Sequence, residues 1–214
     1  MEKQSTKERY LITALRLFAE KGYDAVSVAQ IAAAVGLTPP ALYRHFSGKQ
    51  ALFDAIIALS NQDFPSRMGK LGIGFTHDPE ERAAFSRMSE DEQVRLIQQL
   101  FLHTLEDEYP ALFRKMMIVE QFRQPQMAEI YNRRYVDAQY EAFTALMQDG
   151  IDRGDYLAGN ARTMAVQYIS PVIVMVGVCD RAPERKDEAL TLIADHVRQF
   201  DHIYRSRRRE IGIC

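Results

Sequence analysis

Three neighbouring side chains and a fourth nearby supply hydrogen-bond donors of four chemical kinds. Tyr43, Arg44 and His45 carry a phenol, a guanidinium and an imidazole, and Lys49 adds an ammonium group four residues later. Phenol, imidazole and ammonium groups donate to phosphate oxygens, which fixes a protein's register on a duplex without reading its sequence. Arg44 can reach either a phosphate or the O6 and N7 atoms of guanine. The chemistry that this segment supports is binding to a nucleic-acid backbone.

Taken alone, such a run is more often an ordinary solvated helix face, so the elements that position it carry the interpretation. Two short helices are expected over Val28–Val35 and Pro39–Phe46, joined through Gly36, which adopts positive φ in a tight turn at low cost. Leu42 and Phe46 are expected to anchor the second helix on a core formed by Leu15, Phe18 and Ile31. The polar side chains then face outward, which is the arrangement of a helix-turn-helix.

Serine residues mark several helix starts along the chain. Each is followed three residues later by Glu or Gln, the spacing of a capping box, in the pairs Ser5–Glu8, Ser27–Gln30, Ser47–Gln50 and Ser89–Glu92. Apolar residues recur with a helical period, and strand signals are weak throughout. The sequence therefore predicts an all-α chain of about nine helices, over Thr6–Glu20, Val28–Val35, Pro39–Phe46, a fourth from Lys49, Ser89–Glu108, Pro110–Phe122, Pro125–Arg153, Ala158–Val178 and Glu184–Arg208. Residues 64–88, which include several prolines and glycines, are expected to form a connector.

Charge is unevenly distributed over the 214 residues. Residues 1–50 contain seven Lys or Arg and four Asp or Glu, whereas the remainder contains 20 and 25. A basic head on an acidic body fits a molecule that meets phosphate at one end only. The two cysteines are too few for a disulfide framework, and the first residues lack the apolar stretch of a signal peptide. The most apolar run, Ile169–Val178, is too short to span a bilayer, so we expect a cytoplasmic protein with no membrane partner.

Common enzyme motifs are absent from the sequence. The five histidines show no metal-ligand spacing, and there is no Gly-x-Ser-x-Gly segment. The Gly48-Lys49-Gln50 segment lacks the earlier glycine and the hydroxyl residue of a phosphate-binding loop. We therefore expect no catalytic residue, no cofactor and no metal, and a small helical enzyme is the weaker alternative.

The segment from Ala14 to Phe53 resembles the tetracycline-repressor (TetR) family of regulators. It reads Ala-Leu-x-Leu-Phe-Ala-x-Lys-Gly-Tyr, then Ser-Val-x-x-Ile-Ala-x-x-Val-Gly, then Ala-Leu-Tyr-Arg-His-Phe-x-x-Lys-x-x-Leu-Phe. The resemblance covers roughly residues 8–56, and the remainder is similar only in helix number and layout. It implies a helix-turn-helix DNA-binding domain at residues 1–50 and a larger helical domain for ligand binding and dimerisation at residues 51–214. It also implies a homodimeric repressor that a small hydrophobic effector releases from palindromic double-stranded operator DNA; a DNA-binding dimer without an effector is the alternative.

The resemblance assigns roles to individual residues of the helix-turn-helix. By position, Tyr43, His45 and Lys49 match residues that grip phosphates in this family. Ser27 and Thr38 begin helices, where backbone amides favour an anion. The full set of candidate DNA contacts is Ser27, Thr38, Pro39, Pro40, Ala41, Tyr43, Arg44, His45 and Lys49.

Three positions depart from the base-reading residues of some family members. Ala29 stands where some members place an arginine, and Pro39 and Ala41 replace polar readers. Prolines and alanine can touch thymine methyl groups but donate no side-chain hydrogen bond. Base-specific hydrogen bonds are therefore expected to be sparse, with DNA shape more important.

The middle of the chain is rich in aromatic and methionine side chains. Such residues with a few polar tips suit an adaptable apolar pocket, although any one of them is more often a plain core residue. Together with the family resemblance they predict an effector pocket from Phe101, His103, Met116, Met117, Glu120, Tyr135, Tyr140, Phe143 and Tyr168.

The last two expected helices carry apolar stripes of nearly heptad spacing, which favour helical partners. In this family the last two helices pair with their copies in a dimer; packing within one chain is the alternative. The predicted dimer contacts are Ile169, Val172, Val176, Ile193, Val197, Phe200 and Tyr204.

Overall fold

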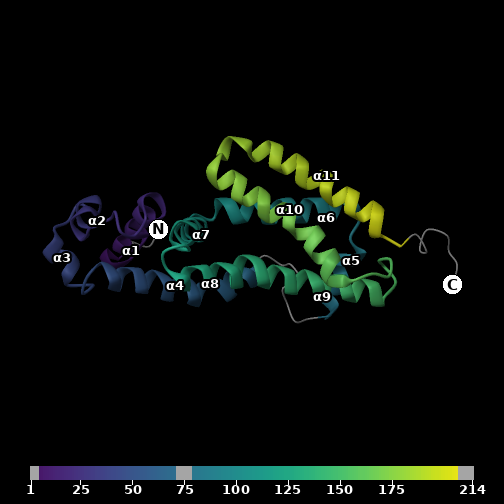
Figure 1. Cartoon of the computed structure of the whole chain (residues 1–214), viewed down its shortest axis with the longest axis horizontal. Helices are drawn as coiled ribbons and strands as arrows, with labels where there is room; N and C mark the ends of the chain where they lie inside the picture. Colours follow the sequence, from purple (N-terminus) through teal and green to yellow (C-terminus); the bar gives the residue numbers. More distant parts are fainter. Residues whose placement is uncertain (1–4, 71–78, 207–214) are drawn as a thin grey trace. The chain divides into compact units, whose positions relative to one another are not determined.

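The computed structural model describes residues 5–70 and 79–206, which are helical almost throughout (Figure 1). Its helices are α1 (Thr6–Lys21), α2 (Val28–Ala34), α3 (Pro39–Tyr43), α4 (Lys49–Lys70), α5 (Pro79–Arg87), α6 (Glu90–Glu106), α7 (Glu108–Glu120), α8 (Pro125–Tyr131), α9 (Ala138–Asp152), α10 (Ala161–Arg181) and α11 (Lys186–Tyr204). A π-helical stretch, η1 (Asn132–Asp137), joins α8 to α9, and a short 3₁₀ turn, η2 (Pro183–Arg185), precedes α11. Over the described ranges the only extended pairing is one isolated bridge between Tyr156 and Arg205. The prediction of an all-α fold is confirmed.

The structure corrects the expected connector at residues 64–88. Backbone helix continues through Pro65 to the end of α4, and α5 adds a helix that the sequence did not predict. A proline removes one hydrogen bond of the helical ladder, and it can kink a helix without ending it. α8, η1 and α9 follow one another without a break and together form the single helix expected at Pro125–Arg153. When they are counted as one, the described residues contain ten helices. Gly72 and Gly74 of the expected connector, and residues 207–208 of the last expected helix, lie outside the described residues.

Packing divides the chain into two compact units, which are described separately. The first comprises residues 1–67 and 107–131, and the second comprises residues 68–106 and 132–214. The first unit therefore joins α7 and α8 to the N-terminal helices, although both follow α6 along the chain. Residue 50 does not mark a packing boundary, and the functional division predicted there remains a prediction.

The core of the first unit lies between α1, α2, α3 and the first turns of α4. Its apolar side chains fall on one face of each helix, so that burial joins the helices by removing apolar surface from water. The fully buried members include Ala14, Leu15, Phe18, Ile31, Ala32, Leu42, Leu52 and Ile56. Phe18 and Phe53 meet edge to face, with ring centroids 5.8 Å apart. On another side of α1, α7 packs along it.

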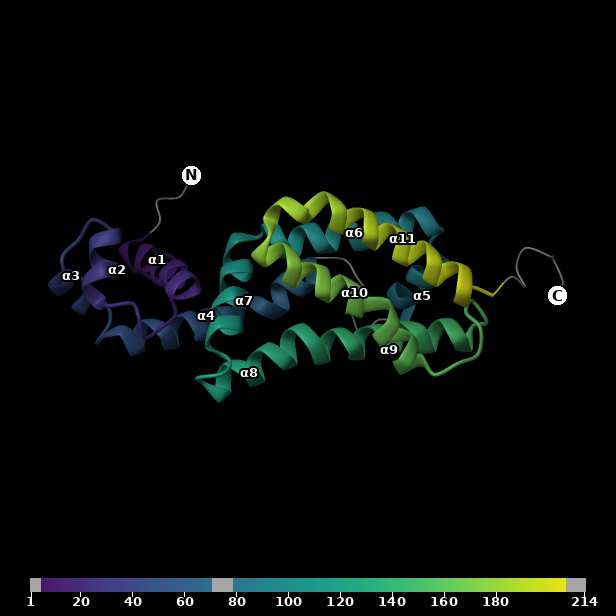
Figure 2. The ribbon, with the colours of Figure 1, turned by 45° about the horizontal axis from the view of Figure 1, so that its top comes forward.

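The second unit is built around α10, which lies alongside α9 and α11 (Figures 1 and 2). The packed rings of Phe85, Phe143, Tyr168 and Phe200 form its centre, and Tyr168 and Phe200 meet with centroids 4.7 Å apart. Gly150 of α9 has no room for a larger residue, because an added Cβ would overlap the ring of Tyr156. Aromatic burial of this kind gives the unit a large apolar core.

A charged side chain fixes the end of α11 to the rest of the second unit. Arg205 pairs with Asp201 at 2.6 Å and donates to the carbonyl oxygens of Ser86 and Met88, each at 3.0 Å. The Ser86 hydroxyl in turn donates to the buried carboxylate of Asp155 at 2.8 Å. Hydrogen bonds to charged groups are stronger than neutral ones, so this network holds the end of α11 in one place.

Among the described helices, α10 alone is long and apolar enough to pass for a membrane span by length and composition. It is longer than the apolar run Ile169–Val178, because helical residues continue on both sides of that run. One face of α10 is buried in the core of its unit, including Ala165, Tyr168 and Val172. A core helix passes the same test, so a single such helix is weak evidence for a membrane.

Candidate nucleic-acid interface

The turn between α2 and α3 has the geometry that its residues predict. Ser27 and Gln30 form the expected capping box at the start of α2. Gly36 has φ of 75°, in the left-handed region that glycine tolerates, and the Leu37 amide donates to Ala32 at 2.9 Å. Arg9 of α1 donates to the carbonyl oxygen of Val35 at 2.8 Å, so a charged group satisfies the end of α2.

α3 is a short helix that presents its far side outward. Thr38 precedes it without a side-chain capping bond, and Pro39 and Pro40 occupy its first positions. Regular α-helix ends at Tyr43, three residues before the expected Phe46, but the Phe46 amide still donates to Leu42 at 3.0 Å. Leu42 and Phe46 are buried as expected. Anchoring both ends of the segment keeps the residues between them at the surface.

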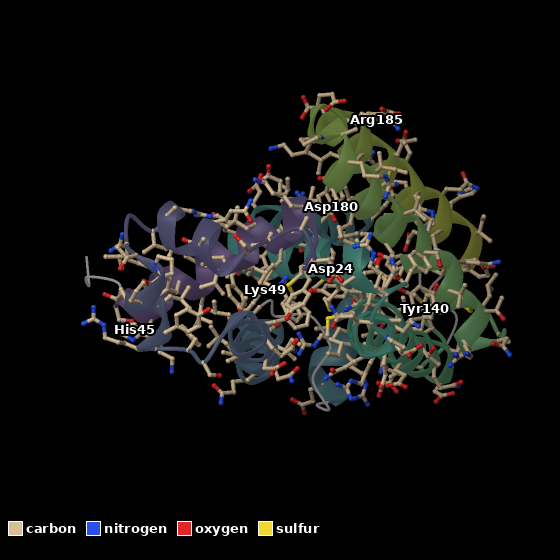
Figure 3. All side chains as sticks on the ribbon, turned by 60° about the vertical axis from the view of Figure 1, so that its left-hand side comes forward. Asp24, His45, Lys49, Tyr140, Asp180 and Arg185 are labelled. Carbon is tan, nitrogen blue, oxygen red and sulfur yellow. The ribbon has the colours of Figure 1, made fainter. Side chains whose placement is uncertain are left out.

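The four predicted donors differ in exposure. Tyr43, Arg44 and His45 are exposed, and the His45 ring rests 5.9 Å from the buried ring of Tyr10. Lys49 is only half-exposed. Its ammonium group donates to the carbonyl oxygen of Tyr23 at 2.7 Å and lies 4.2 Å from the centroid of the Tyr23 ring. Figure 3 labels His45 at the edge of the unit and Lys49 near Asp24, the residue after Tyr23. The first three side chains can meet a ligand directly, whereas Lys49 is oriented by the protein itself.

The remaining candidate contacts offer little side-chain hydrogen bonding. Ser27 is exposed, but its hydroxyl oxygen already accepts from the Gln30 amide at 3.2 Å. Thr38 and Pro40 are exposed, and Pro39 and Ala41 are half-buried. This surface is therefore polar at Tyr43, Arg44 and His45, and largely apolar at the start of α3.

Several residues that organise the interface were not predicted from the sequence. Tyr23 holds the start of α4 through its hydroxyl, which donates to Gln50 at 2.7 Å. Gln50 also donates to Asp54 at 2.9 Å, and no hydrogen bond of the described residues joins Gln50 to Ser47, so the expected capping box is not formed. The buried Glu120 of α7 accepts from the Tyr23 amide at 2.7 Å. The two residues on α7 and α4 are far from Tyr23 in sequence, and no local spacing signals these contacts.

The structure places the predicted pocket residues in both units. Met116, Met117 and Glu120 lie on α7 in the first unit, where all three are buried. The other six lie in the second unit: Phe101, Phe143 and Tyr168 are buried, Tyr135 and Tyr140 are half-buried, and His103 is exposed. Tyr140 shares a hydrogen bond of 3.1 Å with Ser170. Their role in effector binding remains a prediction.

A pocket of about 230 Å³ in the second unit has a different and charged lining. Its residues come from η1, the start of α9 and the start of α10, and they are Arg133, Asp137, Ala138, Glu141 and Arg162. This volume is below the range of pockets that hold drug-sized ligands. The described residues contain no group of three or more His, Cys, Asp or Glu side chains that could hold a metal ion.

The predicted dimer contacts lie on α10 and α11. Six of the seven are buried within their own unit, namely Ile169, Val172, Val176, Ile193, Val197 and Phe200, and Tyr204 is half-buried. The exposed apolar side chains of the same two helices are Val174, Leu192 and Ile203. A partner chain that approached these helices would meet this second set first.

Comparison with known proteins matches the helix-turn-helix to one family. The sequence model of the bacterial regulatory proteins of the tetR family matches residues 11–56. The transcriptional regulator AcrR of Shigella flexneri is 30% identical over 138 residues, which are 62% of this chain and 62% of AcrR. The repressor BdcR of Escherichia coli is 42% identical over 50 residues, which are 23% of this chain and 25% of BdcR. The chain therefore matches less than two thirds of the length of these relatives.

Solved structures extend the likeness to the whole fold. A TetR-family regulator from Mesorhizobium loti has a TM-score of 0.63 at 20% identity, over 94% of this chain and 100% of that one. By sequence the likeness to the tetR family covers residues 11–56, and by fold it covers nearly the whole chain. A second structure, that of the repressor SmeT of Stenotrophomonas maltophilia in complex with triclosan, has a TM-score of 0.62 at 19% identity, over 96% of this chain and 94% of SmeT. At this identity the likeness of the chain to these solved structures concerns the fold alone.

Proposed function

We propose that this protein is a DNA-binding transcriptional regulator of the TetR family that represses genes by occupying an operator. One observation supports this most: Tyr43, at the end of α3, and Arg44 and His45, in the turn after it, are exposed between Leu42 and Phe46, which anchor the segment in the core. A recognition helix in the major groove needs a firm base and an outward row of donors. The excess of basic residues in the first 50 residues agrees with this role.

The proposed contacts divide by chemistry. Tyr43, His45 and Lys49 would donate to phosphates, with Thr38 and Ser27 beside them, and Arg44 would reach either a phosphate or guanine. The start of α3 would meet the bases through Pro39, Pro40 and Ala41, which pack on thymine methyl groups. Because these residues donate no side-chain hydrogen bonds, DNA shape would supply much of the specificity.

We propose that the working form is a homodimer on a palindromic operator. Two recognition helices about 34–36 Å apart are needed to read half-sites one helical turn apart. The family likeness supports α10 and α11 as the contact helices. Val174, Leu192 and Ile203 are the best candidates for direct contact, since the seven residues predicted from the sequence are mostly covered by their own unit.

A small hydrophobic effector is proposed to release the DNA. The SmeT–triclosan complex supports this by likeness, because an apolar molecule binds a protein of the same fold. The methionines of α7 and the aromatic residues of α6, α9 and α10 remain the candidate lining. A DNA-binding dimer without an effector is the second candidate, whereas the family match weighs against an enzyme. A cytoplasmic location follows from this role.

Selection of bound fragments from a pool of random-sequence duplexes tests the proposed function. We expect enrichment of a palindrome whose half-sites are about 10 base pairs apart. A variant carrying Tyr43→Ala and Arg44→Ala should select nothing. Failure of the wild-type protein to enrich any sequence would refute a specific operator. A small molecule that raises the melting temperature and weakens binding would then support an effector.

A further inference from the structure

Glu120 is a buried carboxylate that the proposed DNA contacts do not use. It lies at the end of α7 with 1% of its surface exposed. One carboxylate oxygen accepts from the Tyr23 amide at 2.7 Å, and the other accepts from the side chain of Gln124 at 3.2 Å. A buried carboxylate is costly unless such bonds satisfy it, so these contacts define where Glu120 must stay.

The opposite side of Tyr23 is held by Lys49. The Tyr23 carbonyl oxygen accepts from the Lys49 ammonium group at 2.7 Å, and the Tyr23 ring lies 4.2 Å below it. A carboxylate on α7 and an ammonium group on α4 therefore hold the amide and the carbonyl of one residue. Because all these residues belong to the first unit, the path from α7 to α4 is complete within it.

This arrangement orients a side chain that is otherwise flexible. A lysine has a four-carbon stem with many rotamers and three ammonium donors. Here one donor is committed to Tyr23, and the structure gives Lys49 no other hydrogen bond or ion pair among the described residues. The two remaining donors have no partner among the described residues, and the side chain is half-exposed, so they are available to an anion from solution. Such prior ordering strengthens binding by lowering its entropic cost.

We propose that Glu120 is a positioning residue for the phosphate contact of Lys49. It holds the backbone at the Tyr23 amide, and the Tyr23 carbonyl, which also accepts from the Val26 amide at 3.3 Å, then holds the ammonium group. The inference rests on the proposed DNA binding, and it extends that function to a helix outside the helix-turn-helix. Met116 and Met117 lie one turn earlier on α7, so a ligand that displaced α7 would also loosen Lys49.

Three variants of Glu120 separate positioning from plain structural support. Glu120→Gln keeps an oxygen that accepts from the Tyr23 amide. Glu120→Asp keeps the charge but withdraws the oxygen by one methylene group, and Glu120→Met removes the acceptor. If Glu120→Met does not fold, Glu120→Asp still moves the acceptor away. Glu108→Met is the matched control, because Glu108 lies on the same helix and is exposed in a pair with Arg16.

The measurement is the affinity for a labelled random-sequence duplex as a function of salt. The log–log slope for Glu120→Asp and Glu120→Met should be shallower by about 0.9 for each lost Lys49 contact. If the affinity at 1 M salt is unchanged, a slope shallower by about 0.9 means that the loss of one contact weakens binding roughly eightfold at about 0.1 M salt. Glu120→Gln and Glu108→Met should keep the wild-type slope. Adding Lys49→Met to Glu120→Met should change nothing further.

The outcomes separate this inference from the proposed function. Folded Asp and Met variants with the wild-type slope would overturn the positioning role. So would losses that simply add to that of Lys49→Met, because independent sites are additive. A wild-type protein whose affinity for DNA does not change with salt concentration would instead refute the DNA-binding function itself.

Discussion

Lys49→Met should destabilise the protein in the absence of any DNA. The substitution keeps the apolar stem but removes the hydrogen bond to Tyr23 and the ammonium group over its ring. A hydrogen bond from a charged donor contributes about 1.5–3 kcal/mol, and an exposed cation–π contact about 0.5–1 kcal/mol. Lys49 is half-exposed, which reduces both contributions, so we expect a loss of about 1–2 kcal/mol. A lysine used only for phosphate contact would cost nothing in this assay.

Thermal melting followed by circular dichroism measures this loss. For a chain of this length, 1–2 kcal/mol lowers the melting temperature by roughly 2–8 °C. Lys21→Met is the control, because Lys21 is an exposed lysine of the same unit with no hydrogen bond to the described residues. Equal melting temperatures for Lys49→Met, Lys21→Met and the wild type would refute the role of Lys49 in holding Tyr23.

Three further predictions concern the second unit. Gly150→Ala should lower stability by about 1–3 kcal/mol, because the new Cβ would lie 2.7 Å from Cε2 of Tyr156, and thermal melting checks it. Gly177→Ala is its control: the nearest atom, 3.6 Å away, is the flexible end of Arg181, so better helix propensity should leave this variant at least as stable as wild type. Burial raises the pKa of Tyr156 from 10.0 to about 12. Ionisation is easier in the unfolded chain, so this group's stabilisation is complete below pH 10 and is lost by about pH 12, an effect of about 3 kcal/mol. Tyr156→Phe should reduce that alkaline loss; the same loss in both proteins, in denaturant titrations at neutral and alkaline pH, would contradict this. Finally, Leu192→Glu should shift the protein from dimer to monomer in sedimentation, whereas Leu157→Glu, at a leucine of similar exposure (49% against 45%), should not; an unchanged dimer in both would contradict the proposed contact helices.

Local sequence patterns were enough to predict the helix-turn-helix. Gly36 adopts the positive φ expected of it, Leu42 and Phe46 are buried, and the capping boxes at Ser5 and Ser27 form. These features depend on residues within a few positions of one another, where spacing and backbone chemistry decide the conformation. The same locality explains why the exposed donors at the end of α3 and in the turn after it could be identified.

Contacts between distant segments could not be read from the sequence. Gln50 has capping-box spacing from Ser47, but its side-chain oxygen accepts a hydrogen bond from the Tyr23 hydroxyl instead. Glu120 was expected to be a polar group of a pocket, and its contact with the Tyr23 amide depends on α7 packing against α1. The apolar stripes of α10 and α11 predicted buried seams, yet spacing cannot say whether the partner helix belongs to the same chain. In the structure most of those residues are buried within one unit.

The dependence of DNA affinity on salt tests the central claim most directly. The claim is that the exposed donors Tyr43, Arg44 and His45, together with Lys49, bind the phosphate backbone. It predicts that log affinity falls linearly with log salt, with a slope of about −0.9 per neutralised phosphate, for random and selected duplexes alike. Arg44→Ala and Lys49→Met should each make the slope shallower. An affinity that stays constant across the salt range, or a slope that neither substitution changes, would contradict the claim.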